Sequence, residues 1–275
     1  HIPHAYGAYE ELLANSSIQA VYISLPNHLH YDWILKALQS GKHVLCEKPM
    51  CLSMTQLEEV EQASLESGLK VMEGFMHLYH PQTRLWKSIL ESGVLGEIQY
   101  IRSNFAFTLE RPSDNYRWDS DAGGGALLDV GVYPISLFQF LLDENPESGM
   151  ASMAMQGGID MSTGAMLQFS HGRSGHFFVS FKSDFSTDTC VHGSLGQLHV
   201  THPYTNVDAC QAYIQSGNKT DHIEVPREYL YAGEIENMHD MILSGKPSQI
   251  PFSFSKNVLR TILMLQHDVK SFPPK

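Results

Sequence analysis

Cysteine is scarce in this sequence, which contains only Cys46, Cys51, Cys190 and Cys210 among its 275 residues. No two of them have C-x-x-C spacing, and each lies in an apolar or mixed segment. This pattern disfavours a disulfide framework or a zinc knuckle, and it favours reduced thiols in a reducing compartment such as the cytoplasm. No set of His, Asp and Glu residues has metal-ligand spacing either, so we expect no bound metal.

Long apolar runs and clusters of basic residues are also lacking. No apolar run approaches the roughly 20 residues of a membrane-spanning helix, so we expect no association with a membrane. Lysine and arginine total 18 against 30 acidic residues, and the formal net charge of −12 disfavours a nucleic-acid partner. Hydrophobic residues make up 43% of the chain, which is enough for one large or two medium domains.

The first third of the chain alternates between strand-like and helix-like patterns. Short apolar runs at 21–25, 44–46 and 70–72 have the length and composition of buried strands, and the segments between them have helical periodicity. Ser53, with a glutamine three residues later, has the pattern of a helix N-cap, and Gly68 has that of a helix stop. The alternation predicts βαβ units and a parallel sheet covered on both faces.

After Gly96 the pattern becomes mostly strand-like, apart from a helix predicted to follow the glycine run 123–125 and two closing helices. Turn residues separate the strand-like segments, which is typical of a mostly antiparallel sheet with one solvated face. The strand-like segments are 98–107, 151–156, 164–170, 175–183, 192–200 and 212–225, and the closing helices are 234–243 and 255–269. We therefore expect an α/β region at 1–95 and an α+β region at 96–275.

Two short motifs carry the chemistry of the chain. The run Cys46-Glu47-Lys48-Pro49 follows a predicted strand, and because a proline restricts the backbone of the residue before it, the turn aims the Lys48 side chain. Taken alone, this motif is also typical of a solvated lysine at a strand end. The run 123–133 places Asp129 and Tyr133 four residues apart on one face of a predicted helix. The alternative for that pair is a helix-terminal carboxylate and a half-buried aromatic ring.

Together the two runs resemble the Gfo/Idh/MocA family of nicotinamide-dependent oxidoreductases, named after glucose-fructose oxidoreductase, inositol dehydrogenase and a rhizopine catabolism protein. The presence of Tyr133 four residues after Asp129 is similar to the branch of dimeric dihydrodiol dehydrogenases and glucose-fructose oxidoreductase. The resemblance continues in order through segments 20–30, 41–49, 73–76, 80–82, 93–98 and 234–247.

The resemblance implies an NAD(P)-dependent dehydrogenase or reductase that transfers a hydride between nicotinamide and a CH–OH or C=O group of a sugar, cyclitol or diol, with NADP slightly preferred. It implies a Rossmann-like, incomplete dinucleotide-binding domain at 1–95 and an α+β domain at 96–275 that binds substrate and forms a homodimer or homotetramer through its sheet. The implied catalytic residues are Lys48, Tyr133 and Asp129. The implied cofactor-binding residues are Leu25, Pro26, Asn27, Glu47, Lys48, Arg117 and Trp118.

The chemistry of hydride transfer explains why residues of these types are needed. When a hydride leaves or joins a carbinol carbon, a proton must leave or join its oxygen, so a proton donor of tunable pKa must lie within hydrogen-bond reach. Lys48 and Tyr133 are the candidates, and we expect both in one cleft at the carboxyl ends of the parallel strands. Asp129 is expected to orient a substrate hydroxyl or to pair with Lys48. His30 is expected to pack or cap rather than to bind a ligand.

One feature of the family is lacking. Its members begin with a strand and a G-x-G-x-x-G turn that holds the cofactor pyrophosphate, whereas the only glycines here before residue 42 are Gly7 and Gly41. We expect that the first βαβ portion of the domain is missing and that the chain is N-terminally truncated. The alternative is a non-catalytic binding or scaffold protein on the same fold that has lost cofactor binding.

Overall fold

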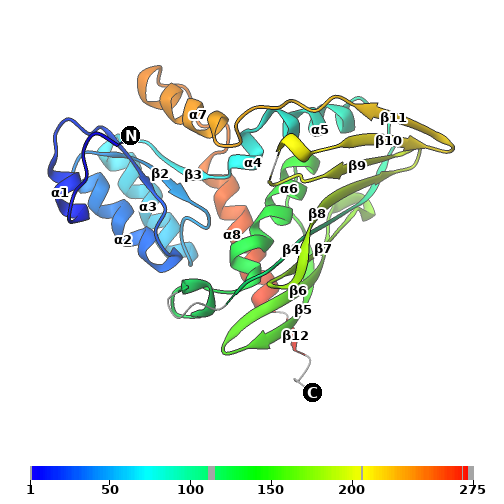
Figure 1. The fold of residues 1–275 in the computed structure, drawn as a ribbon, viewed down its shortest axis with the longest axis horizontal. Helices are drawn as coiled ribbons and strands as arrows, with labels where there is room; N and C mark the ends of the chain where they lie inside the picture. The colour runs from blue at the N-terminus through cyan, green and yellow to red at the C-terminus, as the bar shows by residue number, and fades with distance from the viewer. Residues whose placement is uncertain (1, 111–114, 206, 268, 272–275) are drawn as a thin grey trace. The chain divides into compact units, whose positions relative to one another are not determined.

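The computed structural model describes residues 2–110, 115–205, 207–267 and 269–271. The chain folds into two compact units (Figure 1). The first unit runs up to Gly74 and includes Glu236–Lys256, and the second contains Phe75–Ile235 and the stretch from Asn257 onward. The domain boundary predicted after residue 95 remains a prediction.

The first unit is built on three parallel strands in the order β1-β2-β3. Helix α2 connects β1 to β2, and α3 connects β2 to β3, so the predicted strand–helix alternation is confirmed. The elements are α1 (Tyr9–Ala14), β1 (Ala20–Ile23), α2 (Asn27–Gln39), β2 (His43–Glu47), α3 (Met54–Ser67) and β3 (Val71–Gly74).

Local chemistry explains where α3 begins and ends. The Ser53 hydroxyl accepts a hydrogen bond from the Gln56 backbone N–H at 3.2 Å, which satisfies one of the helix's unpaired N-terminal donors. Gly68 ends the helix with a left-handed φ of 69°, a conformation that costs glycine little. Leu57 and Val60 are buried and fix the inward face of the helix. The predicted cap and stop are therefore confirmed.

The second unit contains a nine-stranded sheet within the described residues, in the order β11-β10-β9-β8-β4-β7-β6-β5-β12. Most neighbouring strands are antiparallel, as predicted, but β4 pairs in parallel with β7 and β12 in parallel with β5. The strands are β4 (Ile98–Thr108), β5 (Ser148–Gln156), β6 (Ile159–Gln168), β7 (Ser174–Ser180), β8 (Lys182–Gly193), β9 (Gln197–Thr201), β10 (Ala212–Ser216), β11 (Lys219–Ile223) and β12 (Val269–Ser271).

The prediction of one strand at 192–200 was wrong. These residues form the end of β8, a tight turn and most of β9. The Gly193 backbone N–H donates to the Gly196 carbonyl at 2.9 Å and closes the turn. Apolar residues continue on both sides of this turn, so the hydrophobic pattern alone did not reveal it. The closing helix predicted to reach Val269 also ends earlier, and Val269 begins β12.

Helix α6 forms the core of the second unit. Ten of its eleven residues are buried, and Phe138 lies so close to β7 that a Cβ added at Gly175 would be 2.6 Å from its ring. The helices and helical turns of this unit are α4 (Met76–Tyr79), α5 (Pro81–Glu91), η1 (Tyr116–Trp118), η2 (Leu127–Gly131), α6 (Val132–Leu142), η3 (Ser170–Gly172) and η4 (Val207–Ala209). Two further helices, α7 (Ala232–Leu243) and α8 (Phe252–His267), contribute residues to both units.

The sheet carries a cross-strand row of side chains that includes histidine, tyrosine, arginine and cysteine. Burial alternates along β7, where Phe177 is buried and His176 is exposed. The strand register aligns His176 with Arg102, Cys190, His199, Tyr213 and His222 in what we call the histidine row. The rings of His199 and Tyr213 stack with centroids 4.7 Å apart.

Among the helices that the structure describes, none has the length and apolar character needed to cross a membrane.

Candidate functional site

Lys48 lies directly after β2, at the carboxyl end of the parallel sheet. The Lys48–Pro49 peptide is cis, and the Lys48 side chain is half-buried. The neighbouring Glu47 carboxylate accepts hydrogen bonds from the Tyr22 hydroxyl and, at 3.3 Å, from the Lys48 backbone N–H. Glu47 therefore stabilises this loop.

His30 connects this loop to the one that follows β1. Its two ring nitrogens lie 2.9 Å from the Pro49 carbonyl oxygen and 2.7 Å from the Leu25 carbonyl oxygen. Burial lowers the pKa of His30, and the two carbonyl contacts only partly oppose this effect. The histidine therefore ties together two loops at one edge of the sheet, in agreement with the packing role predicted for it.

The predicted cofactor residues of the first unit gather at this edge. Leu25 and Pro26 form the loop between β1 and α2, and Asn27 is the buried first residue of α2. Because β1 and β2 are adjacent and parallel, this loop and the Glu47–Lys48 turn end on the same side of the sheet. Ligands of open α/β sheets bind at such carboxyl ends.

The glycine run in the second unit permits a close backbone approach. The Gly124 N–H donates to the Asp119 carbonyl at 2.8 Å, and the Gly125 N–H donates to the Arg117 carbonyl at 3.1 Å. A Cβ at Gly124 would lie only 2.6 Å from the Arg117 oxygen. The run therefore packs against the η1 turn, and only glycine leaves room for this contact.

This packing brings Arg117 to Asp129. The Arg117 Nε donates to the Asp129 Oδ2 at 2.7 Å, and only 6% of the Asp129 side chain is exposed. Burial by itself lowers the pKa of Arg117, but the Asp129 charge and hydrogen bond outweigh it, so the pKa lies above its ordinary value. Arg117 was predicted to touch the cofactor; within the second unit it forms an ion pair with a predicted catalytic residue.

Asp129 and Tyr133 lie on one continuous helical segment, as predicted, but its first part is not α-helical. Asp129 lies in η2, a five-residue π-helical segment, and Tyr133 lies in the first turn of α6. Segments of this type inside helices frequently occur at functional sites. Sequence spacing did not reveal it, because π-helical turns have no residue signature comparable to an N-cap.

Asp160, which was not predicted, anchors the start of η2. Its Oδ2 accepts hydrogen bonds from the Leu127 backbone N–H at 2.8 Å and from the Thr163 hydroxyl at 2.6 Å. A Cβ at Gly125 would lie 2.2 Å from its Oδ1. Burial raises the pKa of Asp160 to about 6, although these hydrogen bonds favour the ionised form. Aspartate is unfavourable inside a strand, and its presence there is the one feature of the sequence that could have indicated a special role for Asp160.

The ring of Tyr133 is held by three other rings. Its centroid lies 5.0 Å from His77, 5.3 Å from Phe105 and 5.4 Å from Tyr204, and its hydroxyl lies 3.7 Å from the Met76 sulfur. His77 is fully buried, and its Nε2 lies 3.0 Å from the Ser136 hydroxyl. Nothing in the sequence distinguishes His77 from an ordinary core histidine, and its contact with Tyr133 is visible only in the folded structure.

The predicted site residues therefore form two groups. Leu25, Pro26, Asn27, Glu47 and Lys48 belong to the first unit. Arg117, Trp118, Asp129 and Tyr133 belong to the second, where η1 carries the first two and the η2–α6 segment the others. That Lys48 and Tyr133 share one cleft remains a prediction.

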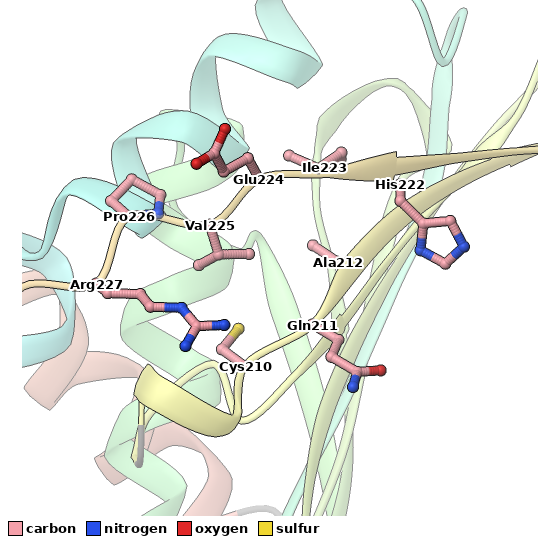
Figure 2. A pocket seen from close by; sticks show the side chains of 9 residues that line it. All are labelled: Cys210, Gln211, Ala212, His222, Ile223, Glu224, Val225, Pro226 and Arg227. Atoms are coloured by element: carbon pink, nitrogen blue, oxygen red, sulfur yellow. The ribbon is translucent and has the colours of Figure 1, made fainter.

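A separate pocket of about 800 Å³ lies in the second unit, between η4 and the end of β11 (Figure 2). Arg227 extends toward Cys210, whereas His222 points outward from the strand (Figure 2). None of the predicted site residues lines this pocket, so we do not assign the reaction to it. The lining residues are Cys210, Gln211, Ala212, His222, Ile223, Glu224, Val225, Pro226 and Arg227.

A parallel sheet with polar residues at its carboxyl edge, followed by a mostly antiparallel sheet, is an architecture that two-domain dinucleotide-dependent oxidoreductases use. Residues 1–75 match the family described as "Oxidoreductase family, NAD-binding Rossmann fold", and residues 83–199 match the "GFO/IDH/MocA C-terminal domain". The chain belongs to the Gfo/Idh/MocA family of NAD(P)-dependent oxidoreductases. The resemblance in the sequence and the predicted fold class are thus confirmed.

Several characterised proteins are similar to this chain. D-xylose 1-dehydrogenase (NADP(+)) 2 from Haloferax volcanii is 33% identical over 95% of the chain and 81% of its own length. Trans-1,2-dihydrobenzene-1,2-diol dehydrogenase from Sus scrofa is 29% identical over 82% of the chain and 65% of its own length. The crystal structure of a 3-ketoreductase from Actinomadura kijaniata with NADP and TDP-benzene matches with a TM-score of 0.89 and 29% identity, covering 97% of this chain and 83% of that one.

Proposed function

We propose that this protein oxidises a CH–OH group, or reduces a C=O group, of a sugar, cyclitol or diol. The observation that carries the proposal is the Lys48–Pro49 turn at the carboxyl edge of the parallel sheet in a chain of this family. The similar proteins support the substrate class, since their names specify a xylose dehydrogenase and a dihydrodiol dehydrogenase. Polyhydroxylated or diol compounds are their common chemistry.

Lys48 and Tyr133 supply the proton chemistry in this proposal. Each carries a hydrogen-bond donor that can give a proton to the reacting oxygen or stabilise its negative charge. The ring contacts around Tyr133 restrict its rotation, which fits a group that must hold one orientation. Asp129, paired with Arg117, is proposed to orient a substrate hydroxyl or to pair with Lys48.

The residues at the carboxyl edge fit the nicotinamide half of NAD(P). Leu25, Pro26 and Asn27 offer backbone and amide groups there, and Glu47 and Lys48 offer charged ones. The cofactor, when bound, supplies the hydride acceptor or donor. We propose that Arg117 and Trp118 cover it and that NADP is preferred, which the NADP named for two similar proteins supports.

We further propose that the protein forms a homodimer or homotetramer through its sheet. Met150 and Phe178 support this assignment because they are apolar side chains on strands of that sheet and are 51% and 45% exposed. All four cysteines are free and buried, which supports a reducing compartment such as the cytoplasm. Sedimentation velocity of the protein measures the oligomeric state directly.

The test of the proposed reaction is replacement of Lys48 by methionine, which keeps most of the side-chain volume and removes the proton donor. In the active protein we expect kcat/KM to fall by roughly 10³-fold or more, because acid–base groups contribute on the order of 10²–10⁴. NADPH affinity should stay nearly unchanged, because the Lys48 ammonium group acts chiefly on the reacting oxygen and contributes little to cofactor affinity. Tyr133→Phe should lose less activity if Lys48 can donate alone. Lys36→Met, at an exposed lysine of the same unit, is the matched control. Turnover of Lys48→Met within a few fold of wild type would exclude the role given to Lys48.

A further inference from the structure

Glu73 is a buried carboxylate that the reaction chemistry has not used. It lies on β3, is only 7% exposed, and its Oε1 accepts a hydrogen bond from the Met50 backbone N–H at 2.8 Å. The Ser255 hydroxyl on α8 donates a second hydrogen bond to it. Glutamate is almost never buried without partners, so these contacts require an explanation.

The position of Glu73 in the sheet connects it to Lys48. In the parallel register of β2 and β3, Glu73 lies opposite Cys46, two residues before Lys48. Its side chain reaches the backbone of Met50, two residues after Lys48. Glu73 therefore contacts the chain on both sides of the Lys48–Pro49 peptide bond. Before this bond Glu73 pairs with Cys46 in the strand ladder, and after it the Glu73 side chain accepts a hydrogen bond from Met50.

The electrostatic surroundings of Glu73 include Lys48 itself. Burial raises the pKa of Glu73 to about 7, and the negative charge of Glu47 and the thiols of Cys46 and Cys51 lie close by. The hydrogen bonds from Ser255 and Met50 and the positive charge of Lys48 act in the opposite direction and lower its pKa. Glu73 thus changes its charge in the neutral range, where an ordinary glutamate is fully ionised.

We propose that Glu73 is a positioning residue for Lys48, and that its ionised carboxylate holds the turn of residues 48–50 in the orientation that the reaction needs. The proposal rests on the proposed catalytic role of Lys48. A hydrogen bond from a backbone N–H to a carboxylate is stronger than one to a neutral carboxyl group, so protonation of Glu73 loosens the turn. A misplacement of about 1 Å at a reacting group can cost roughly 100-fold in rate.

The first test is the pH dependence of kcat/KM. In the wild-type protein we expect kcat/KM to rise with pH through a limb near pH 7 as Glu73 ionises. Glu73→Gln should lack this limb and, at pH 8, should be roughly 10- to 100-fold less active than wild type. Ser255→Ala removes a hydrogen bond that favours the ionised form, so the limb should move to higher pH. A limb that stays in place in both variants, with only a lower melting temperature, would show a merely structural role and overturn the proposal.

The second test does not depend on turnover. In protein labelled with ¹³C at the glutamate carboxyl, the Glu73 signal is assigned by its absence in Glu73→Gln, and its titration is followed in Lys48→Met. Because the Lys48 charge lowers the pKa of Glu73, the midpoint should move to higher pH in that variant. An unmoved midpoint refutes the coupling, whatever Lys48 does in catalysis. A moved midpoint with full turnover of Lys48→Met sustains the coupling and refutes the proposed reaction role. Should Glu73→Gln not fold, Ser255→Ala and Lys48→Met decide the question alone.

Discussion

Asp160 offers a prediction in which stability and pH are linked. Asparagine at this position can keep one oxygen in the place of Oδ2, which accepts from both the Leu127 N–H and the Thr163 hydroxyl, whereas alanine removes this shared acceptor. Burial raises the pKa of Asp160 from 3.8 to about 6, and the difference of about two units corresponds to about 3 kcal/mol against the ionised form in the folded state. The contribution of the protonated Asp160 to the free energy of unfolding is fully present below pH 3.8 and is lost as the pH rises through 6.

The expected magnitudes follow from this linkage. Between pH 5 and pH 7.5 the wild-type free energy of unfolding should fall by about 1 kcal/mol through Asp160, and Asp160→Asn should lack this component. Asp160→Ala should be less stable than wild type by about 2–4 kcal/mol at pH 5, because a helix-start N–H and a buried hydroxyl lose their acceptor.

Urea unfolding of the three proteins at both pH values measures these differences, with the exposed Asp121→Asn as control. An identical pH dependence of wild type and Asp160→Asn would refute the assignment of a raised pKa to this group. A neutral effect of Asp160→Ala would refute its role as the anchor of η2.

Two further predictions concern glycines. Gly125→Ala should lower the free energy of unfolding by about 2–4 kcal/mol, because Gly125 has a φ of +109° and the new Cβ would lie 2.2 Å from an Asp160 oxygen. The matched control is Gly157→Ala, where φ is +61° and no atom lies within 4 Å of the new Cβ. This control should lower the free energy of unfolding by about 1 kcal/mol in the same urea titration. The 275-residue sequence contains no G-x-G-x-x-G turn, whose backbone N–H groups would hold the cofactor pyrophosphate. Calorimetric titration of this chain should therefore give an NADPH dissociation constant above the micromolar range. A micromolar dissociation constant would mean that other residues hold the pyrophosphate.

Local signals in the sequence predicted much of the fold. Ser53 and Gly68 set the ends of α3 through hydrogen bonds and dihedral angles that involve only neighbouring residues, so the sequence alone was sufficient. The parallel pairing of β4 with β7 joins segments about 75 residues apart and depends on how the whole sheet assembles. No local pattern reports such a pairing, because its energy comes from contacts that the linear pattern does not contain.

The candidate site divides in the same way. Lys48 was found because a strand and a proline adjoin it in the sequence. Glu73 and Asp160 were not assigned a role, since each acts on a backbone N–H of a remote segment, Met50 in one case and Leu127 in the other. Their significance comes from burial, and burial of a carboxylate is decided by the elements that pack around it.

The position of His30 has a consequence for how its two loops can move. At neutral pH its lowered pKa leaves an uncharged imidazole with a single N–H, yet both ring nitrogens face carbonyl oxygens. The Leu25 and Pro49 carbonyls therefore compete for one proton, and the loop that does not receive it faces a lone pair. A tautomer exchange within this ring would move the hydrogen bond from one loop to the other without any change in charge.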